Sequence, residues 1–222
     1  INKFRHAATV NLLTRRDVLI VASVSCIYGL GSVADYEKFS IEIKIGQDCK
    51  RDKLLRQLSD MQYTRSQIEF KQGMFHVLGD TVEIFPPDRD TVFRLEFFGD
   101  ELERITEADS FTGEEQRELE SVKVFPAKHD VTSMEKIERA AAGIKAELAE
   151  RYNELLAQGK NLEAQQLKTR TEYDLEILLE TGYVTGIENY TRYLNSRAPG
   201  LPPPTLFDYF PKDFLLLWMN RT

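Results

Sequence analysis

The 222-residue sequence predicts a mixed α/β and α+β protein built from more than one domain. A continuous apolar run over residues 18–25 is typical of a strand that is covered on both faces in a parallel sheet. Residues 74–107 contain apolar segments paired around short Gly-Asp turns, which predict antiparallel hairpins. Residues 134–181 carry two long amphipathic patterns, which predict a pair of helices.

The order of these elements predicts an insertion. Residues 1–39 form a partial α/β domain, and residues 204–222 return to it with a second apolar strand. An α+β domain over residues 40–132 and a helical domain over residues 133–203 lie between them. Because neither flanking strand alternates, we expect both to belong to one parallel sheet.

The first domain starts with the end of a helix over residues 7–14 and then enters the strand over residues 18–25. A Gly-containing loop over residues 28–32 follows. Loops at the carboxyl ends of parallel strands commonly bind ligands, although a plain turn between a strand and a helix explains the same pattern.

The α+β domain begins with a half-buried strand over residues 39–45, in which apolar and polar residues alternate. A helix over residues 50–61 would place Leu54 and Leu58 on one face. Two hairpins follow, 74–78 with 81–85 and 91–98 with 101–107, and a last strand covers 122–125. An antiparallel sheet therefore organises this domain.

The helical domain is expected to begin at Thr132, because Thr132 and Glu135 have the spacing of a capping box. Residues 158–160 interrupt the first amphipathic pattern. A second helix then covers residues 161–181 and ends at Gly182, since glycine adopts the left-handed conformation that closes helices. Helices joined so tightly should pack as an antiparallel hairpin.

The charge distribution argues against nucleic acid as the main partner of the α+β domain. The chain has a formal net charge of -7, and residues 40–132 carry 13 basic and 20 acidic residues. A domain that binds DNA through its phosphates needs the opposite sign. We therefore expect a partner other than nucleic acid here.

No motif for catalysis or metal binding occurs in the sequence. The phosphate loop GxxxxGK[ST] and the GxSxG elbow are absent. Cys26 and Cys49 form no CxxC pair, and the three histidines lack the spacing of a metal site. The acidic run over residues 96–120 indicates a solvated face rather than a catalytic pair. We expect no catalytic residue and no metal site.

Neither a membrane span nor a signal peptide is predicted. No apolar run approaches the roughly 20 residues that a membrane helix needs. No N-terminal charged and apolar pattern of a signal peptide is visible either. We therefore expect a cytoplasmic protein that does not contact a membrane.

Several stretches of the sequence together resemble UvrB, a family of bacterial nucleotide excision repair proteins. They are VASVSCIYGLG (21–31), YTRSQIEFKQGMFHVLGDTVEIFP (63–86), RLEFFGDELERI (94–105), FPAKHDVT (125–132), GIENYTRYL (186–194) and PPPTLFDYFP (202–211). The resemblance runs in order through the whole chain except its last five residues, and the start at Ile1 suggests an internal segment of a longer protein. In UvrB, a helicase-type domain is interrupted by a UvrA-binding domain and a mostly helical domain.

The resemblance implies UvrA as the partner of residues 40–132, with damaged DNA and UvrC as partners in the intact complex. ATP and magnesium serve the intact family, but its phosphate loop precedes Ile1 in family order, so we expect no cofactor and no ATP hydrolysis in this chain. Two alternatives are a UvrA-docking module of the transcription-repair coupling factor and a piece of an ATP-dependent helicase-like core. The run over residues 186–211 resembles UvrB more than the coupling factor.

The resemblance also implies residues that bind UvrA. Arginines of the family's middle domain bind UvrA, and the arginine of its Tyr-x-Arg motif matches Arg65. A guanidinium can form two parallel hydrogen bonds with a partner carboxylate. His76 and Leu78 replace a further arginine pair of the family. We therefore expect either weaker docking or compensation by Lys71 and Arg94.

Six residues correspond to positions near the path of DNA in the family: Ser23, Ser25, Tyr28, Arg170, Glu188 and Tyr190. The first three lie where helicase-type strands end in loops, and their hydroxyls and backbone donors could hold phosphates. Tyr190 could stack on a base, or it could be a packed core aromatic.

The last five residues, 218–222, depart from the family. Where the family continues V-D-E-S-H, this chain reads W-M-N-R-T. The codons GTG GAT GAA TCG CAC spell the family motif, and the same bases read one position later spell the observed tail. A one-base frameshift explains the tail, as would a divergent or vector-derived end, and the codons of the source DNA would decide.

Overall fold

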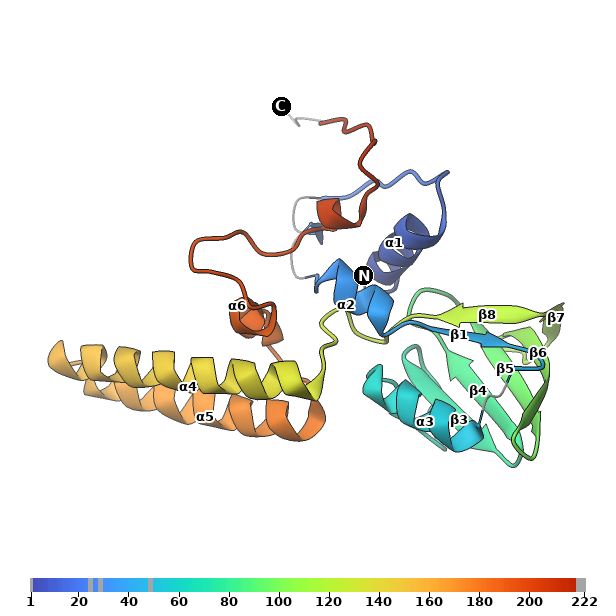
Figure 1. Cartoon of the computed structure of the whole chain (residues 1–222), viewed down its shortest axis with the longest axis horizontal. Helices are drawn as coiled ribbons and strands as arrows, with labels where there is room; N and C mark the ends of the chain where they lie inside the picture. Colours follow the sequence, from blue (N-terminus) through green and yellow to red (C-terminus); the bar gives the residue numbers. More distant parts are fainter. Residues whose placement is uncertain (1, 24–25, 28–29, 48–49, 219–222) are drawn as a thin grey trace.

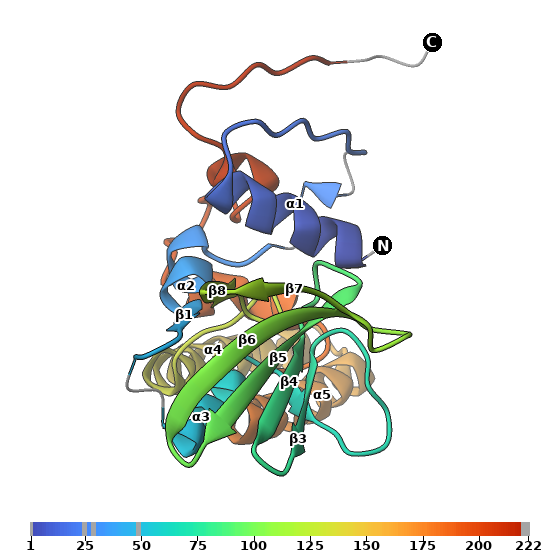
Figure 2. The same cartoon turned by 90° about the vertical axis from the view of Figure 1, so that its right-hand side faces the viewer.

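The computed structural model describes all residues except 1, 24–25, 28–29, 48–49 and 219–222. A sheet domain and a long helical hairpin extend in opposite directions from a central junction (Figure 1). The first and last segments of the chain lie close together over this junction, and α1 contacts η3 (Figures 1 and 2). The sheet domain and the helical hairpin are therefore inserted, in sequence, between two chain segments that contact each other in the fold.

The sheet domain holds a six-stranded sheet in the order β2-β3-β4-β5-β6-β7. β2 pairs parallel to β3, and the other neighbouring strands pair antiparallel. The strands are β2 (Thr64–Arg65), β3 (Met74–Leu78), β4 (Thr81–Phe85), β5 (Thr91–Phe98), β6 (Glu101–Asp109) and β7 (Glu115–Leu119). A separate antiparallel ribbon consists of β1 (Ile41–Lys44) and β8 (Ser121–Val124).

Both predicted hairpins are confirmed. The first turn pairs Leu78 with Thr81, and the second pairs Phe98 with Glu101. The glycines of the two turns have φ of 60° and 64°, in the left-handed region that residues with a Cβ avoid. Strands β2 and β7 were not predicted, because the two residues of β2 and the charged, mostly exposed residues of β7 show no alternation.

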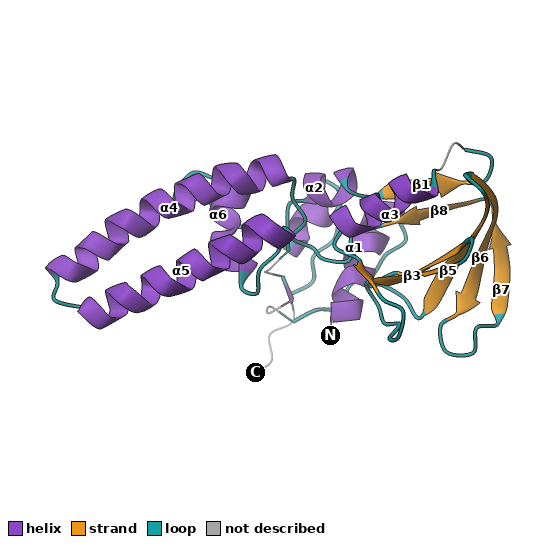
Figure 3. Cartoon of the chain, turned by 90° about the horizontal axis from the view of Figure 1, so that it is seen from below, coloured by secondary structure: helices purple, strands orange, loops and turns teal. Residues whose placement is uncertain are grey.

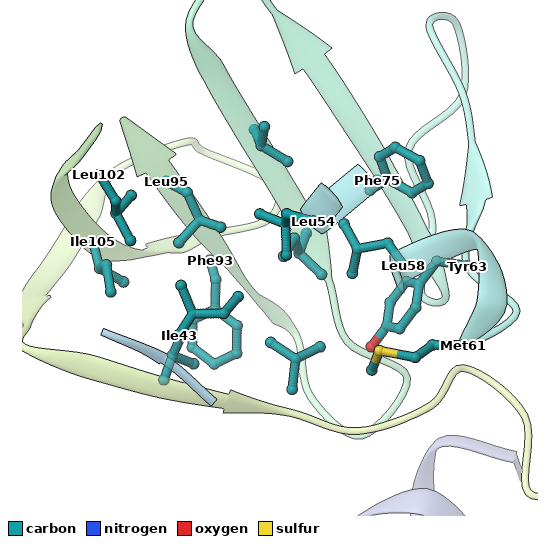
Figure 4. Packing of buried hydrophobic residues seen from close by; sticks show 14 of the residues in the cluster. Ile43, Leu54, Leu58, Met61, Tyr63, Phe75, Phe93, Leu95, Leu102 and Ile105 are labelled. Carbon is teal, nitrogen blue, oxygen red and sulfur yellow. The ribbon is translucent and has the colours of Figure 1, made fainter. Parts of the chain in front are cut away.

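One hydrophobic core joins the sheet, the β1–β8 ribbon and α3 (Arg51–Asp60) (Figure 4). As their spacing predicts, Leu54 and Leu58 point inward from α3 and are fully buried, and Phe75 of β3 packs with them. The Tyr63 hydroxyl donates a hydrogen bond to the Phe125 carbonyl oxygen at 2.8 Å. Each buried side chain of this size contributes about 1.5–3 kcal/mol, so this core stabilises the sheet domain.

The helical hairpin is confirmed as an antiparallel pair, α4 (Met134–Ala157) and α5 (Asn161–Thr181) (Figure 3). α5 ends with Gly182 in the left-handed conformation, as predicted. The short elements η2 (Ile187–Tyr190) and α6 (Thr191–Leu194) follow, and they pack on the hairpin through a shared core.

The predicted capping box at Thr132 is wrong. α4 begins at Met134 with Ser133 as its N-cap, and no side chain caps it. Thr132 follows the buried Val131 and lies two residues before the first residue of the helix, where its hydroxyl has no hydrogen-bond partner among the described residues. A capping box occurs instead at η3 (Leu206–Tyr209), where the side chain of Thr205 and its N3 residue cap each other.

The α+β character is confirmed, but the flanking strands predicted for the partial α/β domain are not formed. α1 (Asn2–Thr14) and α2 (Val33–Lys38) are helical, whereas the described residues of 18–25 and of 205–217 include no strand. Leu19 and Val21 are 87% and 81% exposed. A strand exists only through hydrogen bonds to a neighbour, and no described strand lies beside either segment.

Aromatic side chains from distant parts of the sequence fill the junction. His6 of α1 stacks on His129 with ring centroids 3.8 Å apart, and Tyr36 of α2 stacks on His129 at 5.4 Å. His129 Nε2 lies 3.1 Å from the Thr9 hydroxyl, and His6 Nδ1 lies 3.2 Å from the Tyr36 hydroxyl. Tyr209 of η3 meets Tyr36 edge-on at 6.1 Å. His6 and His129 are far apart in the sequence, so no sequence pattern predicts this stack and only the fold brings the two rings together.

Gly31→Ala is expected to destabilise the chain by about 3 kcal/mol. A Cβ there would lie 2.2 Å from the His129 carbonyl oxygen, so the junction would have to open. Gly46→Ala is a control, because a Cβ there meets nothing within 4 Å and only its φ of 75° causes strain, worth about 1 kcal/mol. Thermal denaturation compares the two variants. Equal losses of stability would show that the close approach of Gly31 to the His129 carbonyl oxygen does not exclude a side chain at residue 31.

Candidate docking surface

The pleat of the six-stranded sheet sorts its side chains onto two faces. In cross-strand register, Phe75, Ile84 and Phe93 point toward α3 and form the core. Their strand neighbours point to the opposite side, which α3 and the β1–β8 ribbon leave uncovered (Figures 2 and 3). We call this side the outer sheet face, and it carries His76, Leu78, Glu83, Arg94, Glu96, Phe98, Arg104, Thr106, Glu115 and Glu118.

Ion pairs run across the outer sheet face as a ladder. Arg94 Nε donates to Glu83 at 3.0 Å, and Arg94 Nη1 donates to Glu115 at 3.3 Å. Arg104 Nη2 donates to Glu115 at 2.8 Å, and this bond lowers the pKa of Glu115 and raises the pKa of Arg104. Such exposed pairs each contribute little to stability.

Thr106 lies directly opposite Arg94 on the neighbouring strand. Its hydroxyl is buried and has no hydrogen-bond partner among the described residues.

The loop over residues 66–73 folds across one end of the outer sheet face. Phe70 stacks on His76 with ring centroids 4.1 Å apart and planes 18° from parallel. His76 Nδ1 lies 4.0 Å from the Glu83 carboxylate, and its buried Nε2 has no hydrogen-bond partner in the described part of the chain. Lys71 is exposed and forms an ion pair within the loop at 2.8 Å. The loop therefore covers His76 and presents Lys71.

Four of the five residues predicted to bind UvrA lie at the outer sheet face. His76, Leu78 and Arg94 belong to its strands, and Lys71 belongs to the loop that crosses it. Arg65 stands apart on β2, at the edge of the sheet. Its side chain is exposed and forms no hydrogen bond or ion pair with any described residue. Of these five residues, Arg65 has the guanidinium most available to a partner, since Glu83 and Glu115 occupy Arg94.

One carboxylate of the acidic run is buried rather than solvated. Glu107 is 6% exposed and accepts hydrogen bonds from Thr91 and from Arg117 Nε at 2.7 Å. Arg89 lies 3.6 Å away on the same side of the sheet. Burial opposes ionisation of Glu107, but these partners outweigh it and lower the pKa. The sequence pattern does not predict this site, because it does not predict β7, the strand that brings Arg117 beside Glu107.

Two residues predicted to lie near DNA meet on the helical hairpin. The Tyr190 hydroxyl donates to the Asp174 carboxylate at 2.7 Å, and Arg170 Nε lies 3.9 Å from the same carboxylate. Burial, followed by the Asp174 hydrogen bond, raises the pKa of Tyr190 to about 12. The Tyr190 ring packs against the helical core and lines a hollow of about 400 Å³. Glu188 faces the junction instead, where burial and then its charge raise the pKa of Asp130 to about 6.

The remaining predicted DNA contacts fall in the first loop. The Ser23 hydroxyl lies 3.5 Å from the Cys26 sulfur. Ser25 and Tyr28 lie outside the described residues. A hollow of about 230 Å³ beside Ser23 is lined mainly by apolar residues of α1 and of the extended segment that follows it.

The described residues were also searched for a metal site and for a membrane-spanning helix. Among the described residues, no three His, Cys, Asp or Glu side chains gather as a metal site requires. The helices of the described part of the chain include none that is long and apolar enough to cross a membrane.

The fold and this surface define a protein-interaction module, a sheet domain with one open face joined to a helical hairpin. The charged residues of that face are largely paired with one another, while Leu78 and Phe98 remain exposed. The family model described as the UvrB interaction domain matches residues 41–129, and the UvrB third helical domain matches residues 135–196. The chain belongs to the UvrB family.

Curated relatives agree with this assignment and with the resemblance expected from the sequence. The chain is 56% identical over 216 residues to UvrABC system protein B of Chloroflexus aggregans, covering 97% of this chain and 32% of the relative. It is 55% identical over 218 residues to the protein of the same name from Geobacillus kaustophilus, covering 98% of this chain and 33% of the relative. The chain thus spans about a third of the length of these relatives, whose names favour UvrB over the coupling factor.

Proposed function

We propose that the chain acts in bacterial nucleotide excision repair as the part of a UvrB protein that docks UvrA. One coincidence carries this proposal: the residues that match the UvrB interaction domain, 41–129, are those that build the sheet domain and its outer face. The net acidity of residues 40–132 also favours a protein partner over nucleic acid. The relatives are named as members of the UvrABC system, which supports UvrA as that partner.

Arg65 is the residue through which this docking is most directly tested. Its guanidinium is exposed and has no partner among the described residues, so docking need not break an existing ion pair. A planar guanidinium held at a sheet edge can form two parallel hydrogen bonds with one carboxylate of UvrA. For Arg94 to bind UvrA in the same way, its ion pairs with Glu83 and Glu115 would first have to break.

Arg65→Ala is expected to weaken binding to purified UvrA about tenfold, equivalent to about 1.4 kcal/mol. The substitution removes charge-assisted hydrogen bonds to the partner and leaves the core untouched, because Arg65 is exposed. Isothermal titration calorimetry of wild type and variant against UvrA measures the change.

Arg56→Ala is the matched control, since Arg56 is an exposed arginine of the same domain on α3. It should bind UvrA as wild type does. Equal affinity of wild type and Arg65→Ala would remove Arg65 from the interface. No binding by the folded wild-type chain would overturn the proposed function itself.

Damaged DNA, UvrC, ATP and magnesium belong, in this proposal, to the assembled system rather than to the sheet domain. Within the helical hairpin, exposed Arg170 is the candidate for a phosphate contact. Tyr190 would contribute only the exposed part of its ring to stacking, because its hydroxyl already donates to Asp174.

A further inference from the structure

The end of α3 and the end of α5 meet where the sheet domain adjoins the helical hairpin (Figure 1). Gln62 lies two residues beyond the last residue of α3. Its side-chain Nε2 donates a hydrogen bond to the Thr181 carbonyl oxygen, at the end of α5, over 3.1 Å. The two residues are 119 positions apart in the sequence. One side chain thus joins the sheet domain to the hairpin.

Gln62 ends α3 in a backbone conformation that glycine normally supplies. Its N–H donates to the Ser59 carbonyl oxygen, and the Tyr63 N–H donates to the Leu58 carbonyl oxygen, both at 2.9 Å. These two bonds are the pattern of a Schellman motif, which needs a left-handed residue, and Gln62 has a φ of 66°. A residue with a Cβ is strained there, whereas α5 ends with Gly182 at a φ of 74°. The hydrogen bond of the Gln62 side chain offsets this strain.

The same hydrogen bond places a donor between two helix ends that both carry partial negative charge. The last carbonyl groups of a helix lack partners within the helix. At the end of α5, the Leu178 carbonyl oxygen accepts from the Gly182 N–H at 3.0 Å, and the Ile177 carbonyl oxygen accepts from the Thr181 hydroxyl at 2.9 Å. The Thr181 carbonyl oxygen receives its donor from Gln62, which belongs to another domain. A carboxamide suits this place because it donates without adding a charge.

A different part of the chain holds the other helix of the hairpin. Lys136, in the first turn of α4, donates to both carboxylate oxygens of Asp35 of α2, at 2.7 Å and 2.9 Å. A contact at α4 alone would leave the hairpin free to pivot about that point. The contact of Gln62 with Thr181 fixes α5 as well, so the two contacts together define the direction of the hairpin.

We propose that Gln62 is an interdomain tie that sets the direction of the helical hairpin relative to the sheet domain. With the tie intact, the two units move as one body, and Arg170 of α5 keeps a fixed position relative to Arg65 at the sheet edge. When the tie breaks, the last turn of α5 frays and the hairpin pivots about its contact at α4. This inference goes beyond the proposed function and does not depend on it, because its test uses the chain without UvrA.

Gln62→Glu and Gln62→Gly break the tie in two different ways. Glutamate keeps the length of the side chain and the strained backbone, but an ionised carboxylate only accepts hydrogen bonds. Glycine removes the side chain and the strain together. Each variant is expected to speed hydrogen exchange of the backbone amides over residues 180–182 about fivefold. Residual dipolar couplings of the backbone amides should fit one common alignment of the two units in wild type, and each variant should lose it.

Gln57→Glu is the matched control, because Gln57 lies on α3 three residues before its end and lines a hollow beside β1. It brings the same charge to the same helix, and it should keep the wild-type exchange rates and the common alignment. Wild-type exchange over residues 180–182 in both Gln62 variants would overturn the tie. Faster exchange with the common alignment kept would overturn its role in the direction of the hairpin. An equal effect of Gln57→Glu would attribute the change to charge near α3 and would also overturn the inference.

Discussion

Lowering the pH from 7.5 to 5 is expected to destabilise the chain by roughly 3 kcal/mol, mainly through the two buried histidines of the junction. Burial and then the charges of Arg5 and Lys128 lower the pKa of His6 to about 3. Burial and then the charge of His6 lower the pKa of His129 to about 2. At pH 5 the folded chain keeps both rings neutral, whereas the unfolded chain protonates both below about 6.5.

The sign of this effect follows from proton uptake. The unfolded chain binds more protons than the folded chain below pH 6.5, so the contribution of the histidines is complete above that pH. It falls as the pH drops further, by ~4 kcal/mol at pH 5 for the two rings together. Asp130 acts in the opposite direction, because burial and then Glu188 raise its pKa to about 6. Protonation of Asp130 in the folded chain offsets about 1 kcal/mol of the stability that the two histidines lose between pH 7.5 and pH 5.

Urea denaturation at the two pH values measures the loss. The control is the double variant His6→Phe, His129→Phe, which keeps two stacked rings but removes both titrating groups. The variant has no histidine at these two positions, so they cannot lower its stability between pH 7.5 and pH 5. The loss of unfolding free energy over this pH range should therefore be ~4 kcal/mol larger in wild type than in the variant. The same pH response in both proteins would show that the stacked histidines do not set acid stability.

Phe75→Ala is expected to destabilise the sheet domain by about 3–5 kcal/mol. Phe75 is 1% exposed in the core between the sheet and α3, so its removal leaves a cavity lined by Leu54, Leu58 and their neighbours. The expected fall in melting temperature is about 10 °C for a chain of this size. UvrA binding should fall with it at temperatures where the domain unfolds.

Phe111→Ala is the matched control, because Phe111 is a phenylalanine of the same domain that is 97% exposed. Phe75→Ala should lose stability, whereas Phe111→Ala should keep the wild-type stability. Differential scanning calorimetry distinguishes the two. A stable Phe75→Ala protein would mean that the core repacks around the cavity.

Elements that close within a few residues were predictable from the sequence. The two hairpins depend on Gly-Asp turns and on the alternation beside them, and both lie where the pattern places them. The helices α4 and α5 follow from their apolar spacing, and Gly182 ends α5 as predicted. Each of these patterns depends only on residues close together in the sequence, so the sequence alone predicts the element.

The candidate site was predictable only in part. Family motifs pointed to Arg65, Lys71, His76, Leu78 and Arg94, and the structure brings all but Arg65 to one face. Neither the pairing of Arg94 with Glu83 and Glu115 nor the stacking of Phe70 on His76 follows from any local pattern. Both depend on strand register, which long-range pairing sets.

The sequence by itself determined the α+β character, the hairpins, the helical pair and the resemblance to UvrB. The tertiary structure alone decided that the segment over residues 18–23 forms no strand, that Glu107 is buried beside Arg117, and that His6 stacks on His129. The physical reason is common to all three. A strand, a buried ion pair and an aromatic stack each need a partner from a distant part of the chain, and apolar or charged composition alone does not supply that partner.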